Sequence, residues 1–252
     1  HEGFEYVYEN ISPNIHLASI SGGTDICGCF MLGVPNLPVY AGQIQGPALG
    51  LDVQVFAEDG KPAAVGVKGE LVCRNAFPSV PLYFWDDPDG DKFRSAYFER
   101  FAGVWTHGDF VEVTAESGYV MHGRSDATLN AAGVRIGTAE IYRITEEFAE
   151  IVESLAIAQN WEGDTRVILF VKLSDGAQLS ESLISQIKLA LKQKASPRHV
   201  PALIMQAPDF PHTKSNKLVE IAVANAINKV AITNLGALAN PESLDWFINL
   251  NL

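Results

Sequence analysis

The sequence has few cysteines and no long apolar run, and each shortage excludes a class of protein. Its three cysteines, Cys27, Cys29 and Cys73, are an odd number without the paired spacing of a metal site. They favour a reduced, cytoplasmic protein over a disulfide-stabilised secreted one. No stretch resembles a signal peptide, and no apolar run is long enough to cross a bilayer, so we expect no membrane insertion.

Positive charge is also scarce. The chain carries 18 Lys and Arg residues against 30 Asp and Glu residues, a formal net charge of −12, which argues against a nucleic-acid partner. Residues 1–126 hold 7 of the basic and 17 of the acidic residues, so a basic surface for an anionic ligand is expected in the second half. With 252 residues, 47% of them hydrophobic, the chain can form one or two domains with a core.

The first half of the chain has strand patterns. Residues 51–56 alternate apolar and polar side chains, and residues 69–73 return after a turn, which predicts a hairpin in a small barrel or sheet. The apolar run at residues 15–20 predicts a buried strand. The acidic run at residues 86–91 lacks the spacing of a calcium loop, and we expect it to cap a helix over residues 92–101. Because the chain begins in mid-pattern, without Met, we expect a fragment of a longer protein.

The second half alternates helices and strands. After Asp126 the sequence changes to small residues and glycines, which is typical of a hinge between domains. Ser180 is a predicted N-cap for the helix that follows it. The order predicts a compact α+β domain with two helices on one face of a small sheet. We expect helices over residues 138–150, 180–194 and 218–228, and strands over residues 152–159, 166–173 and 202–206.

Three stretches carry candidate site residues. In Ser21-Gly22-Gly23-Thr24-Asp25, glycine amides and Thr24 can hold an anion and Asp25 can hold Mg²⁺, although an ordinary tight turn explains the pattern as well. Asp109 and Arg124 each follow a glycine and offer partners for vicinal hydroxyls and for phosphate or ribose. Between Lys188 and Lys217 lie six basic residues and one acid, which indicates either a phosphate-binding loop or a solvated basic surface.

Four motifs, in this order, are similar to those of a known superfamily. They are Ser21-Gly22-Gly23-Thr24-Asp25, Trp105-Thr106-His107-Gly108-Asp109, Gly123-Arg124-Ser125-Asp126 and the loop of residues 211–217. Together they resemble the adenylate-forming superfamily of acyl-CoA synthetases, peptide-synthetase adenylation domains and luciferases. The resemblance covers the whole chain, as a C-terminal portion. It implies the end of the large AMP-binding domain with its small β-barrel or sheet (1–125), a hinge (126), a small mobile α+β domain (127–230) and a C-terminal extension (231–252).

The resemblance also implies roles for individual residues. Lys217 takes the place of the lysine that catalyses adenylate formation, and Asn216 stands where the family has glycine. Asp25 takes the place of the Mg²⁺-binding acid, and Asp126 that of the hinge on which the small domain rotates. The remaining implied ligands of ATP and CoA are Gly22, Gly23, Thr24, Asp109, Arg124, Gly133, Arg135, Lys192 and Arg198.

Within the superfamily, four stretches resemble the acetoacetate-using CoA ligases more than the acetate-using ones, namely residues 21–26, 126–130, 133–143 and 236–244. The resemblance implies that acetoacetate, ATP and CoA react through an acyl-adenylate to the CoA thioester, AMP and pyrophosphate. Alternatives are an acetate or propionate ligase, a non-catalytic nucleotide- or partner-binding module, and a structural domain without a ligand. Because the family's phosphate loop is not among these residues, this chain by itself is expected to be inactive.

Overall fold

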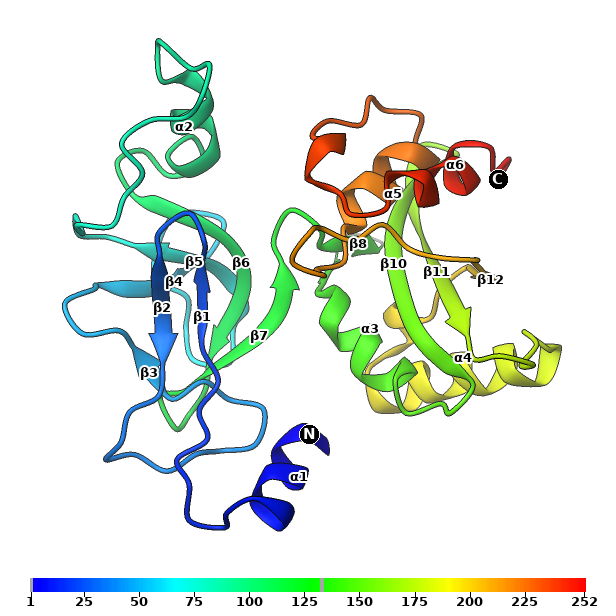
Figure 1. The fold of residues 1–252 in the computed structure, drawn as a ribbon, viewed down its shortest axis with the longest axis horizontal. Helices are drawn as coiled ribbons and strands as arrows, with labels where there is room; N and C mark the ends of the chain where they lie inside the picture. Colours follow the sequence, from blue (N-terminus) through cyan, green and yellow to red (C-terminus); the bar gives the residue numbers. More distant parts are fainter. Residues whose placement is uncertain (1, 132–133) are drawn as a thin grey trace. The chain divides into compact units, whose positions relative to one another are not determined.

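The computed structural model describes residues 2–131 and 134–252 (Figure 1). Gly133, which was expected beside a CoA channel, therefore lies outside the described residues. The chain divides into two compact units, His1–Met121 and His122–Leu252. Each combines helices with β-sheet, which confirms the predicted mixed α/β class. No helix in the described ranges combines the length and the apolarity that crossing a bilayer requires.

The first unit opens with helix α1 (Glu2–Asn10) and a small antiparallel sheet of three strands. These strands are β1 (Ser21–Gly23), β2 (Gly28–Leu32) and β3 (Gly46–Pro47). The strand predicted over residues 15–20 is wrong, because this segment has no regular structure, and Ile15 and Ile20 are 44% and 68% exposed. A short apolar run becomes a strand only where a neighbour offers a hydrogen-bonding edge, and sheet pairing here begins at Ser21.

A second, antiparallel sheet forms the core of this unit. Its strands are β4 (Val53–Phe56), β5 (Gly69–Cys73), β6 (Trp105–Val113) and β7 (Tyr119–Arg124), in that order. The predicted hairpin is confirmed, with Val53 opposite Cys73, and the described strands form open sheets rather than a closed barrel. The acidic run caps helix α2 (Asp91–Tyr97), as expected, since both carboxylate oxygens of Asp87 accept backbone N–H groups of that helix.

The second unit is built around a three-stranded sheet. Strands β10 (Ile151–Trp161) and β11 (Asp164–Leu173) form a long antiparallel hairpin, and β12 (Leu203–Gln206) pairs parallel with β11. All three strands were predicted. Strands β8 (Leu129–Ala131) and β9 (Val134–Ile136) form a separate two-stranded antiparallel sheet.

Helices cover both faces of this sheet, not one face as predicted (Figure 1). Helices α3 (Thr138–Thr145) and α4 (Glu181–Lys194) share one apolar core with strand residues such as Leu169. Helices α5 (Glu220–Ile227) and α6 (Leu244–Ile248) share another with the neighbouring Phe170. Successive strand residues point to opposite faces, so the continuous apolar run of β11 requires cover on both sides.

The C-terminal segment belongs to this second core. Leu244 and Phe247 are 1% and 0% exposed, and each fully buried side chain of this size contributes about 2–3 kcal/mol. Residues 231–252 are therefore packed against the sheet and are not a loose tail.

The predicted N-cap of helix α4 is confirmed, because the Ser180 hydroxyl accepts the Leu183 N–H at 3.2 Å.

Candidate functional site

Two of the four sequence motifs meet in the first unit. The Ser21 hydroxyl on β1 donates to Asp109 Oδ2 on β6 at 3.1 Å. Nε2 of His107 lies 3.7 Å from the same carboxylate oxygen. Asp109 is only 7% exposed, so its carboxylate depends on a small number of partners. The arrangement presents an acceptor of the kind that binds vicinal hydroxyls.

Close packing requires glycine at position 22, whereas the close neighbour of Gly23 is the end of an exposed side chain. A Cβ on Gly22 would lie 2.1 Å from the carbonyl oxygen of Gly28 on the paired strand, and one on Gly23 would lie 2.0 Å from Asp25 Oδ1. Strand pairing therefore explains Gly22 without a ligand. The turn that follows is closed by a hydrogen bond from Cys27 N to Thr24 O at 3.2 Å. Thr24 and Asp25 are exposed on this turn, where a ligand can reach them.

Asp25 is oriented by an aromatic residue. The Tyr97 hydroxyl donates to Asp25 Oδ2 at 2.7 Å, and the Tyr97 ring stacks on Trp105 with 3.8 Å between ring centroids. Within the described ranges, no group of three metal-ligating side chains lies together. Mg²⁺ in nucleotide sites commonly uses one or two carboxylates together with substrate phosphates and waters. The residues present therefore fit a magnesium ion that arrives with a nucleotide, not a site built by the protein alone.

A buried glutamate, which the sequence analysis missed, supports Asp109. Glu70 on β5 is 1% exposed, accepts the Gly108 N–H at 2.8 Å and forms an ion pair with Arg100. Gly108 has φ +83°, and the pairing register between β5 and β6 shifts at this point. Glu70 thus fixes the backbone distortion that immediately precedes Asp109. A signal was present, since Glu70 is the one charged residue in a strand whose residues are all buried.

Three of the predicted residues lie around the turn that follows β7, in the second unit. Arg124 pairs with Asp126, with 3.4 Å between Nη2 and Oδ2, and both side chains are about half exposed. Nη2 of Arg135, on β9, donates to Ser125 O and to Thr128 Oγ1, each at 3.3 Å. Two guanidinium groups therefore flank the predicted hinge.

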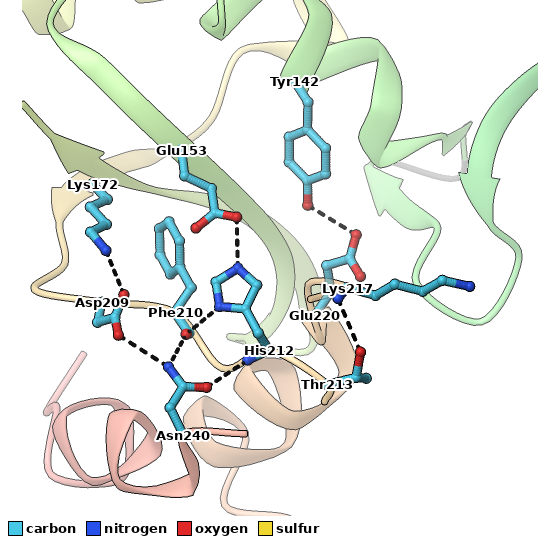
Figure 2. Close-up of polar contacts among 10 residues, drawn as sticks. All are labelled: Tyr142, Glu153, Lys172, Asp209, Phe210, His212, Thr213, Lys217, Glu220 and Asn240. Atoms are coloured by element: carbon cyan, nitrogen blue, oxygen red, sulfur yellow. Dashed lines mark hydrogen bonds and ion pairs between the residues drawn. The ribbon is translucent and has the colours of Figure 1, made fainter. Parts of the chain in front are cut away.

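Lys217 lies on a short hairpin. His212 and Leu218 form its base as an antiparallel bridge, and within it the Lys217 N–H donates to Thr213 Oγ1 at 3.0 Å (Figure 2). The Lys217 side chain is exposed and extends away from the surrounding polar network (Figure 2). Among residues 2–131 and 134–252, its ammonium group makes no hydrogen bond or ion pair. The hairpin therefore offers an available cation on a turn.

The chain just beyond the hairpin is anchored to helix α3. The Tyr142 hydroxyl donates to Glu220 Oε1 at 3.2 Å (Figure 2). Thr138 Oγ1 donates to the same oxygen at 3.2 Å, and the Tyr142 hydroxyl in turn accepts the Ala156 N–H. Burial raises the pKa of Glu220, and the negative charge of Asp126 raises it further. Burial also raises the pKa of Tyr142 well above its ordinary value. Sequence reasoning missed Glu220 because its partners lie 78 and 82 positions away.

The residues expected at the CoA phosphates lie on consecutive elements. Lys192 is in the last turn of α4, and Arg198 is in the short helix η1 (Pro197–His199). Both are exposed. Lys194, between them, forms an ion pair with Glu147, so its charge is already compensated.

Comparison with known proteins first shows which class of protein has this fold. No protein-family model matches the chain. The anthranilate CoA ligase AuaEII, solved in complex with anthranoyl-AMP, has the same fold over 84% of this chain and 40% of its own, with a TM-score of 0.70 and 21% identity. The chain therefore has the fold of part of a CoA ligase.

The more specific similarity is to acetoacetyl-CoA synthetases. The enzyme of Rhizobium meliloti (strain 1021) is 57% identical over 249 residues, which are 99% of this chain and 38% of the relative. The structure of acetoacetyl-CoA synthetase from Streptomyces lividans has a TM-score of 0.90 and 38% identity, over 98% of this chain and 38% of that one. The predicted resemblance is confirmed: the chain resembles the C-terminal portion of acetoacetyl-CoA synthetases and spans about 38% of their length.

Proposed function

We propose that this chain is the C-terminal portion of an acetoacetate–CoA ligase that works through an acyl-adenylate. The observation that carries the proposal is the 57% identity to an acetoacetyl-CoA synthetase over 99% of the chain. The substrates are acetoacetate, ATP and CoA, and the products are acetoacetyl-CoA, AMP and pyrophosphate. The cytoplasmic location suggested by three unpaired cysteines stays a prediction.

In the first half-reaction, a carboxylate oxygen of acetoacetate bonds to the α-phosphorus of ATP. The bond from that phosphorus to the bridging oxygen breaks, and pyrophosphate leaves. Two anions must approach each other, so a cation is needed where charge develops. Lys217 provides it, and one such contact contributes about 10²–10³ in rate. Mg²⁺, when bound with the nucleotide at Asp25, would neutralise further phosphate charge.

Individual motif residues contact the ribose, the phosphates and the substrate carboxylate. Asp109 accepts hydrogen bonds from the ribose hydroxyls, and Arg124 donates to the ribose. Arg135 approaches phosphate oxygens, to which a guanidinium can donate two parallel hydrogen bonds. Gly22, Gly23 and Thr24 lie along the substrate carboxylate and the α-phosphate.

In the second half-reaction, the CoA sulfur bonds to the carbonyl carbon of the adenylate. The bond from that carbon to the AMP oxygen breaks, AMP leaves, and the thiol proton passes to solvent. The small domain, residues 127–230, turns about Asp126 between the two half-reactions, which withdraws Lys217 and presents the segment containing Gly133. Lys192 and Arg198 meet the CoA phosphates as point charges and donors.

The direct test is acid-dependent ATP–pyrophosphate exchange by the complete protein that contains this chain. Acetoacetate, acetate and propionate are compared at equal concentration, with omission of acid as the blank. A preference for acetoacetate of about 100-fold or more in kcat/KM, or about 3 kcal/mol, supports the proposal. A preference for acetate or propionate overturns the substrate assignment. Absence of exchange with all three acids overturns the catalytic function and favours a binding module.

A further inference from the structure

The C-terminal segment pairs directly with the hairpin that carries Lys217. Thr213 and Leu238 form an antiparallel bridge. Beside it, the Lys214 N–H donates to Ala237 O at 3.2 Å, and the Ala239 N–H donates to His212 O at 2.8 Å. The first arm of the hairpin therefore lies between its own return arm and the C-terminal segment. A two-stranded hairpin alone is marginally stable in water, so a third paired segment restricts its conformations.

The side chain of Asn240, in this C-terminal segment, makes three hydrogen bonds to the residues that precede the hairpin and begin it. The amide nitrogen of Asn240 donates to Asp209 Oδ2 at 3.0 Å and to Phe210 O at 2.8 Å (Figure 2). Its amide oxygen accepts the His212 N–H at 2.9 Å. These partners fix the orientation of the amide, because the reversed group would oppose two acceptors with an oxygen. Asp209 also pairs with Lys172 on β11 at 2.7 Å, which connects Asn240 to the central sheet.

The base of the hairpin is fixed from the opposite side by the His212 ring. Nδ1 lies 2.9 Å from Phe210 O, and Nε2 lies 2.8 Å from Glu153 Oε1 on β10 (Figure 2). The ring therefore lies between two oxygen acceptors, one on the backbone and one on a side chain. His212 is therefore held to the sheet through its ring and to the C-terminal segment through its backbone.

We propose that Asn240 is a positioning residue for Lys217. The inference rests on the proposed function, because that function gives Lys217 its role in adenylate formation. Asn240 and the paired residues 237–239 hold the hairpin in the conformation from which the exposed lysine reaches the nucleotide. Without the amide, the hairpin samples other conformations, and Lys217 must be ordered anew in each catalytic cycle. The thioester-forming step does not use Lys217 and is independent of this contact.

The test uses Asn240→Ala in the complete protein and measures the two half-reactions separately. Acetoacetate-dependent ATP–pyrophosphate exchange reports the first, and thioester formation from preformed acyl-adenylate reports the second. We expect the exchange kcat to fall about 10- to 100-fold, the loss typical of a misplaced catalytic group. The KM for ATP and the rate of the second half-reaction stay within about threefold of wild type, which is below 1 kcal/mol.

The matched control is Asn249→Ala. Asn249 lies in the same C-terminal segment, but its amide donates to Asp245 O in the first turn of α6. This variant is expected to retain both half-reactions. Should Asn240→Ala fail to fold, Asn240→Asp provides the second variant, alone and combined with Asp209→Asn. The double variant Asp209→Asn with Asn240→Asp swaps the hydrogen-bond donor and the acceptor between the two positions. Its ATP–pyrophosphate exchange activity is therefore expected to be partly recovered relative to Asn240→Asp alone.

The outcomes separate this inference from the proposed function. Equal losses in both half-reactions, or full exchange activity in Asn240→Ala, overturn the positioning role. If Lys217→Ala abolishes exchange while Asn240→Ala does not, the ligase proposal stands and the positioning role fails. If the wild-type protein shows no exchange with any acid, the proposed function itself fails.

Discussion

The Ser21 hydroxyl donates a hydrogen bond to the Asp109 carboxylate, with 3.1 Å between Oγ and Oδ2, across a sequence separation of 88 residues. This contact joins the glycine-rich motif to the aspartate proposed to bind the ribose. Asp109 is buried, and removing a hydrogen-bond donor from a buried carboxylate destabilises it.

Replacing Ser21 tests the importance of this contact. In the complete protein, Ser21→Ala is expected to raise the KM for ATP about three- to tenfold, because a net contribution of about 1 kcal/mol to the orientation of Asp109 is lost. Ser21→Thr retains the hydroxyl and should behave as wild type. Steady-state kinetics with varied ATP measures the change. An unaltered KM in Ser21→Ala would argue against a nucleotide at Asp109.

Removing Arg100 tests the support beneath Asp109. Arg100→Ala leaves the buried Glu70 carboxylate without its ion-pair partner, which is expected to lower the free energy of unfolding by about 3 kcal/mol. Arg94→Ala is the control, since its pair with Asp91 is exposed on both sides and is expected to contribute less than about 1 kcal/mol. Urea denaturation measures both. Similar losses in the two variants would contradict a special role for Glu70.

The pH dependence of stability tests the environment of Glu220. Burial raises its folded-state pKa above 4.5, so its contribution to stability is fully present below that value and is lost as the pH rises through the folded pKa. Glu220→Gln keeps an acceptor for Thr138 and Tyr142 but does not ionise. Relative to wild type, this variant should become progressively more stable as the pH rises.

The Glu220 experiment is read from urea unfolding at a series of pH values. Glu162→Gln, at an exposed turn of the same unit, is the control and should show no such trend. A stability difference between Glu220→Gln and wild type that does not change with pH contradicts the account.

Asn216 tests the backbone of the Lys217 hairpin. Its φ is +61°, in the left-handed region that glycine adopts freely and that asparagine tolerates better than most residues. Asn216→Gly should therefore retain ATP–pyrophosphate exchange. Asn216→Val is expected to cost about 1–2 kcal/mol of hairpin stability and to slow exchange, because a β-branched residue is strained there. Normal exchange in Asn216→Val would show that the left-handed turn is dispensable.

Local patterns predicted much of the fold. The β-branched run of β11 and the Ser180 cap were both found as expected, since each depends on neighbours in sequence. The strand predicted over residues 15–20 was wrong because a strand requires a partner edge, which a local pattern does not contain. The cover on the second face of the sheet was missed because the pattern of a helix does not show which face of a sheet it packs on, and α5 and α6 both pack on that face.

The candidate site likewise contains residues that local motifs predicted and residues that they did not. Asp109 and Lys217 were predicted from motifs, and the structure places one beside β1 and the other on an exposed hairpin. The residues that support them, Glu70, Glu220 and Asn240, are defined by hydrogen bonds that span 28 residues or more. No local spacing encodes such contacts, so only the folded chain reveals them.

The central claim is that Lys217 serves adenylate formation and not thioester formation. The most direct measurement compares both half-reactions in Lys217→Ala of the complete protein, with Lys214→Ala, on the same exposed hairpin, as the control. The account predicts that ATP–pyrophosphate exchange falls by about 10²-fold or more in Lys217→Ala, while CoA still converts preformed acyl-adenylate at nearly the wild-type rate. Equal loss of both half-reactions would contradict it.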